Sequence, residues 1–375
     1  MKVLFITNIP SPYRVDFFNE LGKGCELTVL FEKPSSNERD DLWKDYHFDT
    51  FKGIFLKGVS IGPATSICFD VKIHLTEDYD VIICSNFTSP TGLLAIRYMK
   101  RHDISYYLEC DGGFAKSGKG IKERIKRYAV SGASGYFSTG RDCDNYYLAY
   151  GADLAKILRY PFSSTHDSDI ADLVLSISEK KALRKELGLS ELPMVLCVGQ
   201  FIHRKGIDVL LKAISLLPFE VTLCCIGGTP MQEYLDLVET LSLKNVIFKE
   251  FMPQSKLKRY YQASDIFVLP TREDIWGLVI NEAIAQGLPI ISTDRCSAAE
   301  ELICDGKNGY IVPTEDFKII AERITKVLSH TGFAEKMSTE SLMKAKEYTI
   351  EQMAARHLQI LERVKDGENK KKINR

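Results

Sequence analysis

The sequence lacks the features that mark several broad classes of protein. Its ten cysteines include no Cys-x-x-Cys pair, and scattered cysteines suit a reducing cytosol, where the residue is a small buried apolar group. No stretch approaches the roughly 18 apolar residues of a membrane span. The apolar run within MKVLFIT at the start is too short for the core of a signal peptide. We therefore expect a cytoplasmic protein, which could also attach peripherally to the inner face of the membrane.

Neither positive nor negative charge is in excess. Lys and Arg number 49 and Asp and Glu number 50, which leaves a net charge of -1. A protein dedicated to nucleic-acid binding would need a basic excess, so we expect no nucleic-acid partner. The sequence also has no internal repeat and no low-complexity core. Its composition is that of an ordinary globular protein, and its 375 residues are enough for two domains.

What the sequence does contain is two series of short apolar runs, each run followed by a turn and usually by a helical pattern. The first series is KVLFIT, ELTVLF, DVIICS, ISYYLEC and GYFST, and the second is MVLCVGQF, VTLCCIGG, VIFKEF, IFVLP and LPIIST. Such runs are typical of parallel strands buried on both faces, with helices as crossover connections. The sequence therefore predicts an α/β protein with two doubly wound domains.

The join between the domains is expected near residues 160–192, where a polar stretch with a proline precedes a charged helical pattern. We place the first domain at 1–170 and the second at 190–345. An amphipathic pattern over 350–366 predicts one more helix before a charged tail.

Two motifs suggest chemistry but favour a structural interpretation. GGFAKSGKG (112–120) is close to a phosphate-binding P-loop, but Gly120 stands where a Ser or Thr would bind Mg²⁺, so a flexible loop is favoured over a nucleotide triphosphatase. Asp142 and Asp144 form an Asp-x-Asp pair after a Ser-Thr-Gly sequence. Acids there suit the first turn of a helix, and a hard cation would want further oxygen ligands, so we expect no metal site.

The second half contains a candidate anion site in VGQFIHRKGIDVLLKA (198–213). A strand is expected to end at Gly199, the following loop carries Arg204 and Lys205, and Gly206 opens a helix. Cations and a helix N-terminus that follow a parallel strand can bind an anion. A solvated basic turn is the alternative, and this stretch alone does not decide between them.

A second stretch, REDIWGLVINEAIAQG, places Asp274 and Glu282 around a helix start at Gly277. The first N–H groups of a helix lack intrahelical partners, and glycine lets another group approach them, so phosphate oxygens could bind there. If the whole stretch were helical, eight steps would span roughly 12 Å, enough for one acid to meet a sugar hydroxyl and the other a ribose hydroxyl across a diphosphate. Two solvated acids are the alternative, although Glu282 lies in a mostly apolar stretch where a charge needs a partner.

These stretches resemble the family-4 glycosyltransferases of GT-B fold, the group 1 glycosyltransferases. The matching segments are GQFIHRKG, PTREDIWGLVINEAIAQGLPI and ELICDGKNGYIVP, in the expected order within residues 195–315. The opening NIPSPYRVDFFNEL looks like a subgroup with a Pro-rich first loop. The resemblance implies two Rossmann-like domains facing across a cleft. The first would bind the acceptor, the second would bind the nucleotide sugar, and the C-terminal helix would cross back onto the first domain.

The resemblance also implies roles for single residues. Lys205, helped by Arg204, would pair with the diphosphate, Asp274 would hold the transferred sugar and Glu282 would bind ribose hydroxyls. The catalytic candidates are Asp274, Lys205 and Asp111. The donor-binding candidates are Gly199, Arg204, Lys205, Ile275, Trp276, Gly277, Leu278, Val279 and Glu282.

Three positions depart from the pattern of this family. Asp274 stands where the family has a glutamate, and Glu273 is one place out of register. Gln200 replaces an arginine, and Asp111 stands about where the family has a histidine in the first domain. These departures concern the detailed roles and leave the predicted class of enzyme unchanged.

The function that the resemblance implies is a metal-independent, retaining hexosyltransferase of bacterial polysaccharide biosynthesis, such as that of capsule or exopolysaccharide. Its co-substrate would be a UDP-, GDP- or ADP-sugar, its acceptor a lipid-linked or growing polysaccharide, and it would need no cofactor. We expect front-face attack rather than a covalent intermediate. A sugar-nucleotide epimerase, or a non-catalytic nucleotide-sugar-binding protein of the same layout, is the alternative.

A basic segment in the first half, KSGKGIKERIKRY (116–128), has apolar residues four apart on one helix face. Such a segment could rest on an anionic membrane, where lipid-linked sugars are found. A solvated basic helix is the equal alternative. The candidates for the acceptor or membrane side are Arg14, Lys122, Lys126 and Arg127.

Overall fold

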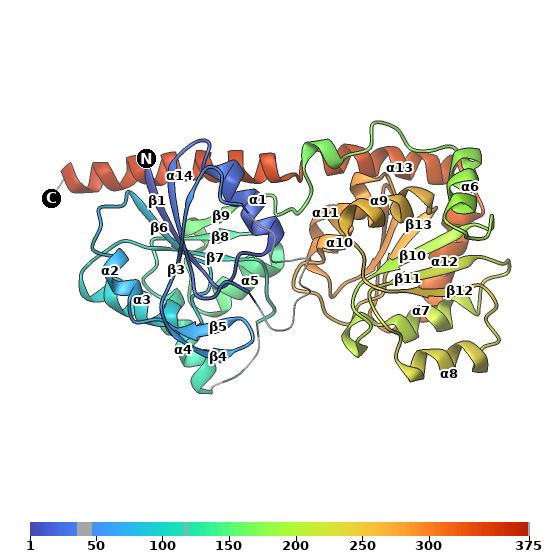
Figure 1. The fold of residues 1–375 in the computed structure, drawn as a ribbon, viewed down its shortest axis with the longest axis horizontal. Coiled ribbons are helices and arrows are strands. Elements are labelled where there is room, and N and C mark those ends of the chain that lie inside the picture. The colour runs from blue at the N-terminus through green and yellow to red at the C-terminus, as the bar shows by residue number, and fades with distance from the viewer. Residues whose placement is uncertain (36–46, 116–117, 119, 374–375) are drawn as a thin grey trace. The chain divides into compact units, whose positions relative to one another are not determined.

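The computed structural model describes residues 1–35, 47–115, 118 and 120–373. The chain divides into two compact units. Unit 1 comprises Met1–Ser163 and Thr349–Arg375, and unit 2 comprises Ser164–Tyr348 (Figure 1). Most of the stretch 160–192 that we expected to join the domains thus lies in unit 2, where its helix α6 (Ile177–Glu186) packs against α9 (Gln254–Ala263).

Unit 1 contains a parallel sheet whose seven strands, among the described residues, have the order β3-β2-β1-β6-β7-β8-β9. The strands are β1 (Lys2–Thr7), β2 (Glu26–Phe31), β3 (Lys52–Phe55), β6 (Val81–Cys84), β7 (Tyr107–Cys110), β8 (Gly135–Ser138) and β9 (Ile157–Arg159). The five predicted runs all form strands. The edge strands β3 and β9 were not predicted, because they are short and only partly buried and so lack a clear apolar run.

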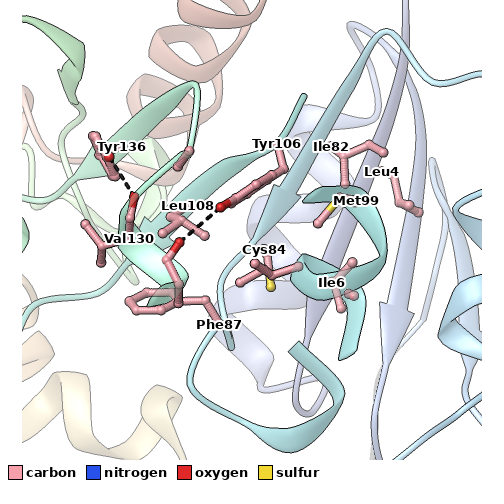
Figure 2. Packing of buried hydrophobic residues seen from close by; sticks show 14 of the residues in the cluster. Leu4, Ile6, Ile82, Cys84, Phe87, Met99, Tyr106, Leu108, Val130 and Tyr136 are labelled. Carbon is pink, nitrogen blue, oxygen red and sulfur yellow. Dashed lines mark hydrogen bonds between the residues drawn. The ribbon is translucent and has the colours of Figure 1, made fainter. Parts of the chain in front are cut away.

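Alternate side chains of these strands face the two layers of helices. Leu4 and Ile6 of β1 belong to a buried cluster with α3 (Pro90–Arg101), α4 (Ile121–Val130) and α5 (Arg141–Ala149) (Figure 2). Phe5, between them, packs on the other face against two phenylalanines of α1 (Pro12–Leu21). The C-terminal helix α14 (Ile350–Ile373) lies alongside α1 (Figure 1). Burial of both faces therefore follows from the period-two alternation of the strands.

The other elements in the described part of unit 1 are the short helix α2 (Val71–His74), the 3-10 helix Leu154–Lys156 and an antiparallel hairpin of β4 (Val59–Gly62) and β5 (Thr65–Ile67). Tyr106 and Tyr136 donate hydroxyl hydrogen bonds of 3.2 and 2.8 Å to the carbonyl oxygens of Ala129 and Val130 (Figure 2). These bonds fix the end of α4 to the sheet.

Unit 2 has a parallel sheet of order β12-β11-β10-β13-β14-β15, with six strands in the part of the chain that is described. The strands are β10 (Met194–Val198), β11 (Thr222–Ile226), β12 (Val246–Lys249), β13 (Ile266–Leu269), β14 (Ile290–Thr293) and β15 (Gly309–Val312). In chain order this is the 3-2-1-4-5-6 arrangement of dinucleotide-binding folds. It confirms the prediction of doubly wound domains. The strand order reverses between β10 and β13, and ligands of such sheets bind beyond the carboxyl ends of the strands at that point.

Helices cover both faces of the sheet in unit 2. They are α7 (Ile207–Ile214), α8 (Gln232–Thr240), α9, α10 (Leu278–Ala285), α11 (Ser297–Leu302), α12 (Phe317–Leu328) and α13 (Thr331–Ala345), with 3-10 turns at Asp167–Asp169 and His203–Lys205. Helix α7 packs against α12, and α10 packs against α13. No helix in the described ranges is long and apolar enough to cross a membrane.

The structure shows where the two motifs that we interpreted as structural lie. Asp142 and Asp144 lie in the first turn of α5, and Asp144 accepts hydrogen bonds from Ser138 (2.5 Å) and Arg159 (2.6 and 2.8 Å). The described residues contain no group of three or more His, Cys, Asp or Glu that could hold a metal ion. The P-loop-like segment falls partly outside the described residues, and Gly120 is the N-cap of α4.

Candidate functional site

The loops that follow β10 and β13 meet at the carboxyl edge of the sheet in unit 2. The backbone N–H of Arg272 donates to the carbonyl oxygen of Arg204 (2.8 Å), and the Thr271 hydroxyl donates to the same oxygen (3.0 Å). Gly206 has φ 70°, and a side chain there would place its Cβ 2.1 Å from the carbonyl oxygen of Pro270. Only glycine permits this approach, which brings the cationic loop onto the segment after β13.

The central contact of the site joins three of the predicted residues. The Lys205 ammonium donates to Oδ2 of Asp274, and Nη1 of Arg204 lies 3.5 Å from Oδ1 of the same carboxylate. The Asp274 and Lys205 side chains are each 12% exposed, whereas Arg204 is 42% exposed. The sequence assigned Lys205 and Asp274 to different parts of a ligand, but here they form one ion pair. Two cations around one carboxylate leave a net positive charge at the point where the strand order reverses.

Glu273, the neighbour of Asp274, faces away from this ion pair. Its carboxylate lies 3.1 Å from Arg295 in the loop after β14. The backbone N–H of Asp274 donates to the carbonyl oxygen of Arg295 (2.8 Å), and Asp274 forms an isolated parallel bridge with Cys296. These contacts fix the backbone so that the Asp274 carboxylate, and not that of Glu273, reaches Lys205.

Helix α10 begins beside Asp274. Gly277 is its N-cap with φ 103°, and an added Cβ would lie 2.7 Å from Sγ of Cys296 and 3.8 Å from Oδ2 of Asp274. Among the described backbone contacts, the N–H groups of Leu278 and Val279 have no carbonyl partner, as expected for the start of a helix. The site thus combines cations with unpaired N–H donors, and both stabilise an anion.

The remaining candidates at this helix start differ from one another in exposure. Ile275 is half exposed, whereas the Trp276 side chain is buried and donates its indole N–H to Asn281 (2.8 Å). The carbonyl oxygen of Trp276 accepts from the N–H of Ala298 (2.9 Å). Trp276 therefore fixes the loop, and its side chain does not point to the ion pair.

Gly199, the candidate at the end of β10, lies against the aliphatic stem of Lys205. A Cβ built on it would be 3.5 Å from Cδ of the lysine. The absence of a side chain at this position therefore leaves room for the aliphatic part of Lys205 to pack against the backbone.

Glu282 lies one turn inside α10. Residues 274–277 are not helical, so the distance between Asp274 and Glu282 that was derived for one continuous helix does not apply. Oε2 of Glu282 accepts a hydrogen bond from the Tyr261 hydroxyl (2.8 Å). Burial, together with the nearby Asp169 carboxylate, raises the pKa of Glu282 to about 7, and the bond from Tyr261 only partly offsets this. A small cavity beside Glu282 is also lined by polar groups of Thr165, Asp169, Gln254, Lys258 and Gln286.

One structural contact at the site could not be found from the sequence. Arg272 binds Asp208 of α7 through two parallel hydrogen bonds of 2.8 Å and also pairs with Glu315 after β15. These partners are 64 and 43 residues away in the chain, and no local pattern signals the pairing. The pairing ties the loop after β13 to two other elements and so makes the site rigid.

In unit 1, Asp111 comes directly after β7, at the carboxyl edge of that sheet. Its oxygens accept hydrogen bonds from Arg14 (2.5 Å) and from the Tyr13 hydroxyl (3.3 Å). Burial raises the pKa of Asp111, Arg14 opposes that rise, and the nearby Glu109 carboxylate adds to it. Arg14 was expected on the acceptor or membrane side, but its side chain is 5% exposed and is held by these carboxylates. It is therefore not a surface cation.

The basic helix α4 presents only part of its charge to solvent. Lys122 and Arg127 are exposed, whereas the Lys126 ammonium lies 3.2 Å from the Tyr150 hydroxyl and 5.4 Å from the centre of the Tyr146 ring. Lys116 and Lys119 lie outside the described residues. The apolar face of α4 lines an open groove of about 570 Å³. Its other walls come from α3 and from the stretch at β5; the lining includes Ile67, Phe69, Leu93, Ile121, Ile125 and Tyr128.

Comparison with known proteins gives a family match inside unit 2 and matches to curated relatives over part of the chain. A family profile described as "Glycosyl transferases group 1" matches residues 179–343. D-inositol 3-phosphate glycosyltransferase from Xylanimonas cellulosilytica is 26% identical over 230 residues, which cover 60% of this chain and 55% of that protein. A GDP-mannose-dependent alpha-(1-6)-phosphatidylinositol monomannoside mannosyltransferase from Mycolicibacterium smegmatis is 31% identical over 159 residues, which cover 39% of this chain and 41% of that protein. The chain thus spans about half the length of these curated relatives.

Solved structures match over nearly the whole chain. Sucrose-phosphate synthase from Thermosynechococcus elongatus is similar with a TM-score of 0.76 and 18% identity, covering 97% of this chain and 99% of that one. HepE from Anabaena, in complex with UDP, is similar with a TM-score of 0.77 and 17% identity, covering 96% and 100%. These likenesses concern the fold and confirm the predicted GT-B class. The chain thus has a GT-B fold, and its residues 179–343 match the profile of the group 1 glycosyltransferases.

Proposed function

We propose that the protein transfers a sugar from a nucleotide-diphosphate sugar to an acceptor hydroxyl, with retention of the anomeric configuration and without a metal or cofactor. The observation that carries this proposal is the arrangement of Lys205 and Arg204 around Asp274, beside the N-terminus of α10. Related proteins add support, because HepE is described in complex with UDP and with UDP-glucose, and the mycobacterial relative is described as GDP-mannose-dependent.

The proposed chemistry follows from where charge develops. When the bond between the sugar and the phosphate breaks, positive charge grows on the sugar and negative charge on the leaving phosphate. Lys205, Arg204 and the free N–H groups of Leu278 and Val279 would stabilise that phosphate. Asp274 would hold Lys205 in place and accept a hydrogen bond from the transferred sugar, and Glu282 would accept hydrogen bonds from the ribose.

In the proposed mechanism the acceptor attacks from the face that the phosphate leaves. The acceptor hydroxyl would form the new bond to the anomeric carbon while its proton passes to the leaving phosphate oxygen. The rival mechanism forms a covalent bond between the sugar and a carboxylate of the enzyme. A sugar trapped on any Asp or Glu of the chain would overturn front-face attack.

The first experiment measures release of the nucleotide diphosphate over UDP-, GDP- and ADP-sugars, with octyl glucoside, octyl galactoside and octyl mannoside as acceptor probes. Release that depends on one donor and continues with a chelator is the expected result. Isomerisation of the sugar without release would instead indicate an epimerase, and binding without turnover would indicate a nucleotide-sugar-binding protein. Loss of release in chelator would contradict a metal-independent reaction.

We further propose that the acceptor is a lipid-linked or growing polysaccharide and that α4 contacts an anionic membrane surface on its cytoplasmic side. The exposed Lys122 and Arg127 supply positive charge beside the apolar groove under α4. Sedimentation with anionic vesicles, before and after Lys122→Glu and Arg127→Glu, tests this contact. Equal sedimentation of the wild type and the charge-reversed protein would indicate that α4 is a solvated basic helix.

A further inference from the structure

A buried chain of ionisable side chains in unit 1 runs from the C-terminal helix to Asp111. Nε2 of His357, on α14, lies 3.3 Å from Oε1 of Glu109, and Nη2 of Arg14 lies 2.9 Å from Oε2 of Glu109 and 2.5 Å from Oδ1 of Asp111. The His357 and Glu109 side chains are 0% exposed and that of Arg14 is 5% exposed, whereas that of Asp111 is 32% exposed. Asp111 is therefore the end of the chain that solvent or a ligand can reach.

Both ring nitrogens of His357 lie against oxygen atoms. Nδ1 is 2.8 Å from the carbonyl oxygen of Met353, and Nε2 faces Oε1 of Glu109. Burial alone would raise the pKa of Glu109, but Arg14 and His357 lower it to about 2, so this carboxylate is ionised. The chain therefore runs from His357 through the Glu109 carboxylate and the Arg14 guanidinium to Asp111.

The His357 ring, at the inner end of the chain, is held from several sides. The His357 ring stacks on Phe137, with ring centres 5.0 Å apart and an angle of 10° between the planes. Phe17 and Tyr160 pack against it with ring centres at 4.7 and 4.3 Å. The fixed His357 ring holds Glu109, which in turn holds the Arg14 guanidinium that contacts Asp111.

Two buried donors beside this chain have no partner. Nη1 of Arg14 and the hydroxyl of Tyr160 make no hydrogen bond among the described residues. Burial and the nearby Glu109 and Asp111 carboxylates raise the pKa of Tyr160 well above its usual value, so the hydroxyl keeps its proton. A buried ion pair is often no more stable than apolar packing, and unpaired donors make it less so. The cluster is thus poorly explained by stability alone, which points to a role at its open end.

We propose that His357, Glu109 and Arg14 are positioning residues that orient the Asp111 carboxylate toward a hydroxyl of a glycan acceptor, so that α14 takes part in acceptor binding. The inference rests on the proposed function, in which unit 1 binds the acceptor. Arg14 donates to one oxygen of Asp111 and Tyr13 to the other, and each oxygen retains a lone pair that can accept from a sugar hydroxyl.

Two substitutions of His357 separate its polar contact with Glu109 from its packing. His357→Phe keeps an aromatic ring against its neighbours but removes the donor to Glu109, whereas His357→Gln removes the ring but keeps an N–H donor. With the octyl glycoside that gives most nucleotide release, His357→Phe should raise the acceptor KM about tenfold, with the donor KM within twofold of wild type. His357→Gln should recover most of the loss, and Gln352→Ala, an exposed position on α14, should change neither constant. A Phe variant that matches wild type, or a Gln variant impaired as much as Phe, would overturn the proposal.

A second measurement does not depend on activity. The carboxyl carbon of Asp111 can be followed by NMR in protein labelled with carbon-13 aspartate and assigned with Asp111→Asn. Because Glu109 raises the pKa of Asp111 and Arg14 lowers it, Glu109→Gln should move the titration midpoint of Asp111 to lower pH. An unchanged midpoint would refute the coupling. If no sugar nucleotide is turned over by wild type, the proposed function fails, while this titration still tests the chain of charges.

Discussion

The Glu282 carboxyl offers a prediction in which the size of the effect depends on pH. Glu282 is half-buried in α10 and accepts a hydrogen bond from Tyr261. Burial and Asp169 raise its pKa to about 7, from 4.5 for an ordinary glutamate. The substitution Glu282→Gln removes the ionisable group but keeps an oxygen that can accept from Tyr261.

The magnitude follows from the linkage between proton binding and folding. Below about pH 4.5 the carboxyl is protonated in both the folded and the unfolded chain, and its ionisation has no effect on stability. Between about 4.5 and 7 the unfolded chain loses this proton and the folded protein keeps it, so stability falls as pH rises, and the full loss is present above 7. The difference in pKa corresponds to at most about 3 kcal/mol, and we expect about 2 kcal/mol because water partly screens a half-buried carboxyl.

The assay compares urea unfolding of wild type, Glu282→Gln and Glu239→Gln at pH 5 and pH 8. Glu239 lies on an exposed face of α8 and serves as the control. The free energy of unfolding of Glu282→Gln, relative to wild type, should be about 1.5 kcal/mol higher at pH 8 than at pH 5, because part of the loss is already present at pH 5. The control should show no such change. A difference between Glu282→Gln and wild type that stays the same at the two pH values would refute the reasoning.

The same substitution should weaken binding of the nucleotide, measured by calorimetry with UDP, GDP and ADP. A hydrogen bond to an ionised carboxylate is stronger than one to a neutral amide, and we expect about a tenfold loss in affinity for the nucleotide that wild type binds best. Stability and ligand affinity would then change in opposite directions, as is common for residues of a binding site. Unchanged affinity for the nucleotide would mean that Glu282 does not bind the ribose.

The remaining predictions concern the loop after β13. Lys205→Ala should lower turnover about a hundredfold or more in the nucleotide-release assay, while circular dichroism shows an intact fold. Near-normal turnover would mean that Lys205 has no role in the reaction. Asp274→Asn should lower turnover and Glu273→Gln should not, because only Asp274 contacts Lys205; the opposite result would shift the register by one residue. Gly277→Ala should destabilise unit 2 by roughly 1–3 kcal/mol in thermal unfolding, because φ is 103° and the new Cβ would meet Cys296 at 2.7 Å; an unchanged midpoint would show that the loop can relax.

Much of the fold could be predicted because the strands are buried on both faces. A run such as VTLCCIGG is apolar along its whole length, and it forms β11 as expected. The edge strands β3 and β9 are short and half-exposed, so their sequences do not differ clearly from those of loops. The hairpin of β4 and β5 was missed for the same reason, because its first strand is largely exposed.

For the site, the sequence by itself determined which residues follow the strands β10 and β13 and where α10 begins, because glycines, turn residues and apolar periodicity are local signals. Only the tertiary structure decided how these residues pair. Lys205 contacts Asp274 across 69 residues of chain, and His357 contacts Glu109 across 248. Such contacts depend on the order of strands in the sheet and on which helix packs on which face. Arg14 is the clearest case: the sequence named it only as a candidate for the acceptor or membrane side, and the folding of α1 and β7 buries it between two carboxylates.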